Sequence, residues 1–362
     1  MSINFFIIFA YAVVILTTIV TTLSIAIVLF NSFAIRREKL IQIERQRLNK
    51  CISLYLKGEI DNATLIRETQ GQESLILGVV VQMAEKADEI ERQKLISMFE
   101  RCGLKSLYQN ELSNLSSKKV ELRVHAVTYL PFIVTEGLLY EGLMTALEDE
   151  TLDVRLAAAK SLARLKFINS VGPILNHLAL PATWPIHRIS EILNEMGAGV
   201  IDPLIAYLNK PQISDASIMV AMSVLGTQKA QTATNAIVQY INHPDKEVRV
   251  QAIKALGRIG NIDNTPDLAQ GLRDDSWEVR SASATALGLL KNPSTVSELG
   301  KSLCDPEWWV RYNSGLALVN MGEEGVAILQ NALGLSDKFA SEISRQILEE
   351  HHIVPTEHLE SK

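Results

Sequence analysis

The side chains of this chain that could bind a metal or move a proton are scattered along its 362 residues. Histidine commonly does both tasks near neutral pH, and a metal site needs several ligands that converge from a rigid frame. No histidine is followed by a glutamate as in a His-Glu dyad, and three of the seven lie in a polar C-terminal tail. The seven are His125, His177, His187, His243, His351, His352 and His358. We therefore expect no metal and no cofactor.

Other catalytic signatures are missing from the sequence as well. It contains no Gly-rich phosphate loop, nucleophile elbow or zinc-protease motif. Cys51, Cys102 and Cys304 stand apart, without a CxxC pair that would indicate a disulfide framework or a zinc site. Paired acids at 148–150 and 274–275 precede helical patterns, where carboxylates stabilise helix N-termini. We expect no small-molecule substrate and a protein that is not an enzyme.

Arginines recur at a nearly fixed interval, each seven residues before the leucine of an Ala-Leu-Gly-like signature. The series of equivalent positions has intervals of 29 to 34 residues and holds isoleucine in place of arginine at two of them. It is Arg123, Arg155, Ile189, Ile218, Arg249, Arg280 and Arg311. Three acids lie six positions before an arginine of this series: Asp149, Asp274 and Asp305. We call these arginines and acids the arginine ladder, and we expect each turn carboxylate to lie near an arginine of the same or the adjacent repeat.

A period of about 31 residues predicts helical hairpins that stack as a solenoid, because one hairpin cannot bury its apolar face alone. Val248, Ala252 and Leu256 have the spacing of an apolar stripe on a first helix. Gly257 and its counterpart Gly288 are expected to end that helix with a positive φ. The sequence thus predicts an all-α protein, a right-handed α-solenoid of helical hairpins preceded by one transmembrane helix.

The repeat resembles a known family. The stretch Asp274-Asp275-Ser276-Trp277-Glu278-Val279-Arg280-Ser281-Ala282-Ser283-Ala284-Thr285-Ala286-Leu287-Gly288 resembles HEAT repeats of the short type found in phycobilisome lyases and many bacterial scaffold proteins. The resemblance covers about residues 90–335. Ile189 and Ile218 depart from it, so we expect the arginine ladder to be interrupted there.

A second resemblance concerns the segment from Ala182 to Ile189, which includes Trp184. It is similar to a stretch of membrane-anchored HEAT proteins of Gram-negative bacteria. That resemblance implies a role beside membrane glycosyltransferases of exopolysaccharide systems.

Residues 3–34 carry no charged side chain and exceed the roughly 20 residues that cross a bilayer. We expect one transmembrane helix. A cleaved signal peptide is the competing interpretation, but it has a basic start and a shorter apolar core. The flank 36–58 holds seven Lys or Arg against two acids. This asymmetry predicts a single-pass protein of the inner membrane, with its N-terminus outside and the solenoid in the cytoplasm.

The expected organisation follows from these patterns. Phe339, Ile343 and Ile347 are expected to point inward from a last, capping helix. The predicted parts are a membrane anchor (1–35), a basic amphipathic stalk (36–60), a helical N-terminal cap with a degenerate repeat (61–120), HEAT-like repeats (121–335), the capping helix (336–350) and a flexible tail (351–362).

Tryptophans are the best candidates for partner contacts, because this residue is enriched at the energetic centres of interfaces. Trp277 and Trp308 share one repeat position, and Trp309 adjoins the second. They either form an exposed aromatic row or wedge between neighbouring repeats. Trp184 in the irregular middle segment is a fourth candidate.

The predicted function is a non-catalytic, membrane-tethered scaffold that binds a membrane-associated protein partner. The alternative is a lyase-like chaperone that acts on a chromophore-bearing protein. The chain carries a net charge of −6 and the flank 36–58 carries +5, so the rest is −11. An acidic body disfavours nucleic acid, which needs a face that neutralises phosphate.

Overall fold

Every regular element that the structure describes is a helix. The structure is a computed structural model, which describes residues 2–101, 105–132, 136–178 and 186–353. The chain divides into two compact units, Met1–Leu139 and Tyr140–Lys362. Their boundary falls inside helix α7 (Glu136–Ala146). The expected all-α fold is confirmed for the described residues.

Unit 1 is built around one long helix. Its helices before the boundary are α1 (Ser2–Leu56), α2 (Asn62–Thr69), α3 (Glu73–Ala84), α4 (Glu89–Arg101), α5 (Lys105–Asn114), α6 (Val120–Tyr129) and the short 3₁₀ helix η1 (Leu130–Phe132). The chain turns between α1 and α2 at a cap, because the Asp61 carboxylate accepts the Thr64 N–H at 2.9 Å.

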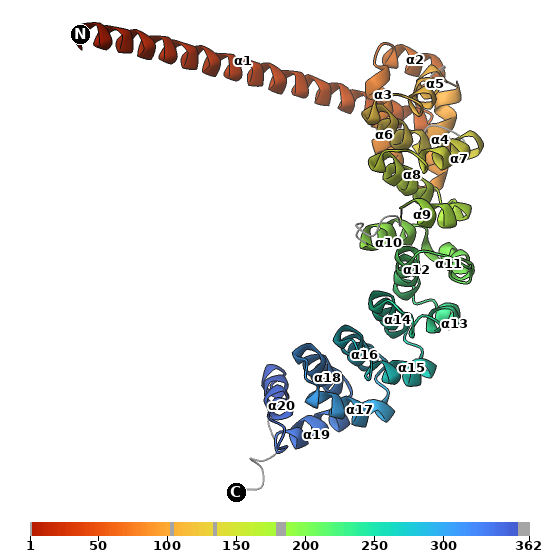
Figure 1. Cartoon of the computed structure of the whole chain (residues 1–362). Coiled ribbons are helices and arrows are strands. Elements are labelled where there is room, and N and C mark those ends of the chain that lie inside the picture. The colour runs from red at the N-terminus through yellow and green to blue at the C-terminus, as the bar shows by residue number, and fades with distance from the viewer. Residues whose placement is uncertain (1, 102–104, 133–135, 179–185, 354–362) are drawn as a thin grey trace. The chain divides into compact units, whose positions relative to one another are not determined.

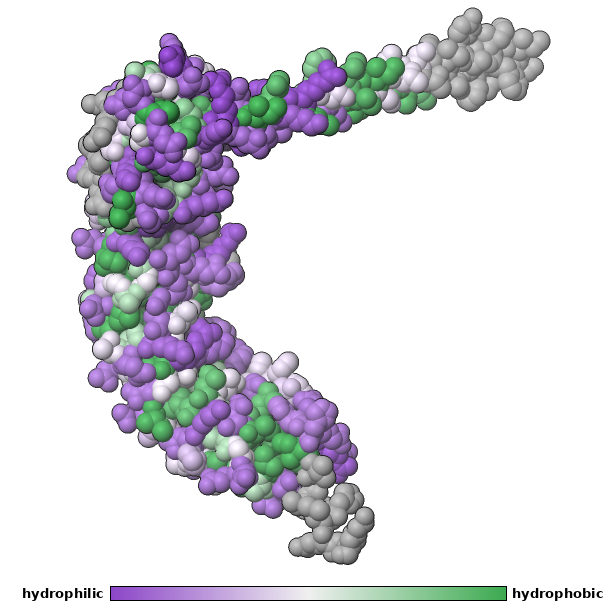
Figure 2. Space-filling model, turned by 180° about the vertical axis from the view of Figure 1, so that it is seen from behind, coloured by the Kyte–Doolittle hydropathy of each residue, from purple (hydrophilic) through white to green (hydrophobic). Residues whose placement is uncertain are grey.

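Helix α1 is long and apolar enough to cross a membrane, judged by length and composition. Figure 2 shows apolar side chains along the part of α1 that projects from unit 1, with polar side chains gathered where it joins. Several hydroxyl side chains of the apolar segment bond to the helix's own backbone. Thr22 Oγ1 donates to the Thr18 carbonyl at 2.8 Å, and the Ser24 hydroxyl donates to the Val20 carbonyl at 2.8 Å. Such bonds make hydroxyls compatible with an apolar environment.

The end of α1 belongs to the core of unit 1. Leu48 and Ile52 are fully buried, whereas Leu40 and Ile43 remain exposed. Arg47 Nη2 donates to the Glu68 carboxylate of α2 at 2.6 Å. One continuous helix therefore joins the apolar segment to a packed core, with a solvated basic stretch between them.

Unit 2 is a stack of helical hairpins. Figure 1 shows its helices in two rows, the even-numbered helices α10 to α20 in one and the odd-numbered helices α11 to α19 in the other. The even row, with α8, comprises α8 (Leu152–Arg164), α10 (Ile186–Asn194), α12 (Asp215–Thr227), α14 (Lys246–Ile259), α16 (Trp277–Leu290), α18 (Trp308–Asn320) and α20 (Lys338–Glu350). The odd row, with α9, comprises α9 (Val171–Leu178), α11 (Ile201–Leu208), α13 (Thr234–Val238), α15 (Thr265–Gly271), α17 (Val296–Lys301) and α19 (Glu323–Ala332).

Short 3₁₀ helices connect the two rows. They are η2 (Ile168–Ser170), η3 (Gly197–Val200), η4 (Gln231–Ala233), η5 (Ile262–Asn264), η6 (Pro293–Thr295) and η7 (Ser302–Cys304). The apolar stripe predicted for the first helix of each hairpin is buried, since Val248, Ala252 and Leu256 are each 0% exposed.

The structure gives the signature glycines a different task from the expected one. Gly257 lies inside α14, which ends two residues later and is capped by Gly260 with φ 77°. Gly288 lies inside α16, whose left-handed cap is Lys291. The prediction that Gly257 and Gly288 end their helices is wrong, because both positions are needed for close contact with the next helix of the row.

The last helix also differs from the expected pattern. Ile343 and Ile347 are buried, but Phe339 is 54% exposed. Near the start of α20 the inward position is that of Ala340, which is fully buried. Phe339 is the second residue of α20, so it points from the first turn rather than along the buried stripe.

Candidate functional site

Each arginine of the ladder first closes the turn of its own repeat. Arg280 Nη1 donates to the carbonyls of Asp274 at 2.9 Å and Asp275 at 3.2 Å. Arg311 Nη1 makes the same pair of bonds to the carbonyls five and six residues earlier, at 2.9 and 2.7 Å. Arg155 Nη1 bonds the Glu150 and Asp149 carbonyls in the same way, at 3.2 and 2.8 Å, and Arg123 Nη1 bonds the Ser117 carbonyl at 2.8 Å. These carbonyls have no helical partner, so the guanidinium satisfies them.

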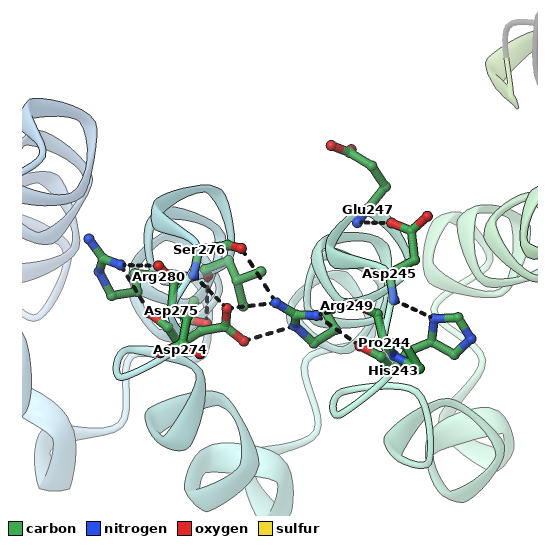
Figure 3. A network of polar contacts seen from close by, with 11 residues as sticks. His243, Pro244, Asp245, Glu247, Arg249, Asp274, Asp275, Ser276 and Arg280 are labelled. Carbon is green, nitrogen blue, oxygen red and sulfur yellow. Dashed lines mark hydrogen bonds and ion pairs between the residues drawn. The ribbon is translucent and has the colours of Figure 1, made fainter.

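Arg249 and Arg280 also bind the next repeat. Arg249 donates from Nε and Nη2 to the two carboxylate oxygens of Asp274, both at 2.8 Å (Figure 3). Arg280 binds Asp305 in the same way, at 2.7 and 2.9 Å. The acid comes from the repeat that follows, 25 residues after the arginine. Of the two placements expected, these pairs show the one between adjacent repeats, whereas within a repeat the arginine bonds turn carbonyls.

The acid of each rung orders its own turn. Asp274 Oδ1 accepts the Ser276 N–H at 2.8 Å, and Asp149 Oδ1 accepts the Thr151 N–H at 2.8 Å. Burial would raise the pKa of Asp274, but the hydrogen bonds from Arg249 and Ser276 outweigh it and hold the pKa below its ordinary value. The bond to Asp274 likewise raises the pKa of Arg249.

The arginine ladder is interrupted at Ile218, where other side chains replace both the arginine and the acid. Ile218 supplies no guanidinium, and His243 takes the place of the acid of the next repeat. Its Nδ1 accepts the Asp245 N–H at 3.2 Å, and its Nε2 lies 3.8 Å from Asp215 Oδ1. At the other end, the Arg311 guanidinium lies 4.7 Å from the centre of the Phe339 ring. The ladder therefore ends on an aromatic ring in α20.

The tryptophans gather at the starts of helices in the even row. Trp277 opens α16, and Trp308 and Trp309 open α18. Trp184 lies outside the described residues. The other three are exposed by 37%, 39% and 54% respectively, so each keeps a large part of its ring in solvent.

Two further aromatic residues join this set, and sequence reasoning missed both. Tyr312 stacks on Trp308, with ring centres 4.8 Å apart at 14°, and Trp309 meets Trp308 edge to face at 4.8 Å and 81°. The signal for Tyr312 was its position four residues after Trp308, on one helix face. Phe339 occupies in α20 the place that Trp309 occupies in α18. We call Trp277, Trp308, Trp309, Tyr312 and Phe339 the aromatic ridge.

One histidine lies against a glutamate that is distant in sequence, so a search for adjacent His-Glu pairs did not find it. In unit 1, His125 Nδ1 lies 3.1 Å from Glu111 Oε2, and the His125 ring stacks on Tyr129 at 4.0 Å. The pair joins α5 to α6. No three metal-ligating side chains come together among the residues that the structure describes.

Part of this chain matches a known sequence family, and the chain is similar in fold to several solved structures. The model of HEAT repeats matches residues 201–276 and 265–339. The search of curated proteins found no significant match to this chain. The Kap95:Nup1 complex aligns at 14% identity over 78% of this chain and 47% of that chain, with a TM-score of 0.49.

Two other solved structures show the same kind of likeness. An engineered protein aligns at 15% identity over 84% of this chain and 98% of that chain, with a TM-score of 0.39. The complex of CpcE and CpcF of phycocyanin lyase from Nostoc aligns at 18% identity over 68% and 94%, with a TM-score of 0.29. Likenesses at this level carry no argument about activity. The matched segments, together with the stacked hairpins of unit 2, identify residues 201–339 as HEAT repeats.

Proposed function

We propose that this protein is a non-catalytic scaffold that is tethered to the inner membrane by α1 and docks a membrane-associated protein through unit 2. The observation that carries the docking role is the aromatic ridge. Trp308 and Trp309 sit on a rigid helix, held in a fixed geometry by ring contacts, yet remain exposed. Rigid, exposed aromatic residues lose little entropy on binding and dominate many interfaces.

The arginine ladder supports this role by fixing the ridge. Arg280 binds the turn before α16 and the turn before α18, the two turns that precede Trp277 and Trp308. Part-buried bonds, bidentate between Arg280 and Asp305, thus hold these ridge residues in register. A scaffold whose binding residues do not reorganise needs this kind of support.

The tether explains why the partner would be a membrane protein. A helix whose uncharged segment is long enough to span a bilayer would confine unit 2 close to the membrane, which raises its effective concentration toward other membrane proteins. In the proposed orientation the N-terminus lies outside, and the basic flank 36–58 and the repeats lie in the cytoplasm. A membrane glycosyltransferase of an exopolysaccharide system is the first partner to test, because the segment 182–189 resembles proteins of such systems.

Site-specific crosslinking in intact membranes tests the scaffold. A photoreactive side chain replaces Trp309 in the full chain, and a matched chain carries it at Ile262, which is 56% exposed but lies outside the ridge. We expect a defined membrane protein to crosslink through position 309 and not through position 262. A chain lacking residues 1–35 should crosslink less. Identical products from both positions would contradict the proposal.

A further inference from the structure

The aromatic ridge crosses the first turns of three successive helices of one row. Trp277 lies on α16, Trp308 and Trp309 on α18, and Phe339 on α20. Phe339 is as exposed as Trp309, both at 54%. Aromatic residues in the first turns of three neighbouring helices form an extended contact surface, not a single isolated side chain.

Carboxylates flank these tryptophans in the sequence. The segments 273–278 and 304–309, which carry the three tryptophans, hold five acids and one base. Two of the acids bind arginines of the ladder, and a third forms an ion pair with Lys246. Asp275 and Glu307 remain exposed. The ridge therefore presents π-faces beside negative charge.

The far end of the ridge carries a further carboxylate. The Tyr312 hydroxyl donates to Glu350 Oε2 at 3.2 Å, and Gln346 Nε2 donates to Glu350 Oε1 at 2.8 Å. The hydrogen bond to Glu350 raises the pKa of Tyr312. The Glu350 carboxylate is thus held beside the stacked rings of Tyr312 and Trp308.

One ring of the aromatic ridge, that of Phe339, already contacts a cationic side chain of the protein itself. The Arg311 guanidinium covers one face of Phe339 at 4.7 Å. Tryptophan binds cations more strongly than phenylalanine does, and arginine stacks well on aromatic planes. Trp277 and Trp309 are exposed and each follows an exposed acid, Asp275 or Glu307, by two residues, so they offer the same chemistry to a cation from outside.

We infer that the aromatic ridge binds a Lys/Arg-rich segment of the protein partner, an inference that rests on the scaffold function proposed above. Charge complementarity favours this occupant over an acidic or purely apolar one, because residues 59–362 carry −11. A membrane protein supplies such segments, since its cytoplasmic flanks are enriched in lysine and arginine.

The spacing of the ridge sets the spacing of the partner's charges. Helices of one row pack about 8 to 10 Å apart. In an extended polyproline II segment, residues three apart lie on one face at about 9 Å. The segment is therefore expected to carry a basic residue at every third position, so that successive cations reach successive helices.

Peptide binding to the full chain in detergent micelles tests the inference. The probe is a fluorescent peptide of Arg-Pro-Pro repeated four times, and binding is measured by anisotropy. We expect the double variant Trp277→Ala, Trp309→Ala to weaken binding about tenfold, and Glu307→Gln to weaken it about threefold. Ile262→Ala should leave binding unchanged, because it removes an equally exposed side chain elsewhere. Unchanged melting temperatures establish that the variants fold.

Three results would overturn the inference: undiminished binding to the double variant, equal binding of a Glu-Pro-Pro peptide, or equal binding of a peptide with its four arginines contiguous. Crosslinking separates this failure from failure of the scaffold. A partner that crosslinks through position 309 but contributes a segment without excess lysine or arginine would leave the scaffold standing and refute the inference alone.

Discussion

Gly257 of α14 lies against Ala286 of α16 so closely that a Cβ atom on Gly257 would come within 2.7 Å of the Ala286 Cβ and 2.9 Å of its Cα. The same contact recurs one hairpin later, where a Cβ on Gly288 would meet the Ala317 Cβ at 2.8 Å. These are backbone approaches that no side-chain rotation can relieve. The repeat glycine therefore sets the distance between neighbouring helices.

Replacing Gly257 by alanine should destabilise unit 2 although alanine is the better helix former. The added methyl group must push α14 and α16 apart, and overpacking of this kind costs about 1 to 3 kcal/mol. Thermal unfolding followed by circular dichroism would show the lowered melting temperature. Gly172→Ala is the matched control, because a Cβ there meets only a Tyr207 ring carbon at 3.8 Å. Equal stability of the two variants would contradict the packing argument.

Arg280→Ala should cost about 3 kcal/mol of unfolding free energy, since it strands a largely buried carboxylate and two turn carbonyls. The side chains of Arg280 and Asp305 are only 14% and 10% exposed. Arg280→Lys should recover little, because an ammonium cannot make the bidentate contact. Lys338→Ala breaks the exposed pair with Glu342 and should change stability by less than about 0.5 kcal/mol. Chemical denaturation measures the free energy of unfolding of all three variants. Similar losses of that free energy for Arg280→Ala and Lys338→Ala would refute the role of the arginine ladder.

Stability should depend on the ionisation of Asp274. Its pKa in the folded state lies below the ordinary value of 3.8, so the contribution of the ion pair is present above that pH. It is lost as the pH falls through the lowered pKa. The gap in melting temperature between the natural chain and Asp274→Asn should therefore hold near neutral pH and narrow below about pH 4. Glu342→Gln, which removes an exposed carboxylate, serves as control, and a gap that stays constant in acid would contradict the assignment.

Periodicity predicted the architecture because burial of Val248, Ala252 and Leu256 depends on local spacing alone. It also placed Arg280 and Asp305 in one ladder, but it could not tell which repeat supplies the carboxylate. That choice depends on the rotation between hairpins. Gly257 was misread as a helix end for a related reason: the contact that requires it lies on Ala286, 29 residues away.

The site was harder to predict than the fold. Trp309 looks the same in sequence whether it is wedged in the core or exposed, and only the packing of α18 decides between them. Phe339 matches the apolar period of α20, yet its place in the first turn directs it outward. Glu111 and His125 meet across two helices, a contact that adjacency in sequence does not report. In each of these cases the sequence did not predict the outcome because it depends on contacts between helices rather than within one helix.

Val20→Arg should release the chain from the membrane. Val20 is exposed in the middle of the uncharged segment, and an arginine there leaves 17 uncharged residues before it from Ile3 and 14 after it to Ala34. Neither stretch reaches the roughly 20 residues that span a bilayer. A charge at the centre of a span costs about 2.5 to 3.5 kcal/mol on insertion. Flotation of membranes in a density gradient measures the bound fraction and separates it from aggregates.

Ile43→Arg provides the control for that experiment. Ile43 lies on the same helix and is as exposed as Val20, at 60% against 54%, but it stands in the basic flank beyond the uncharged segment. An additional positive charge there should leave the membrane-bound fraction unchanged, because this flank is expected to lie in the cytoplasm. If both variants float with membranes to the same extent, α1 does not span the bilayer through its uncharged segment, and the tether in the proposed function fails.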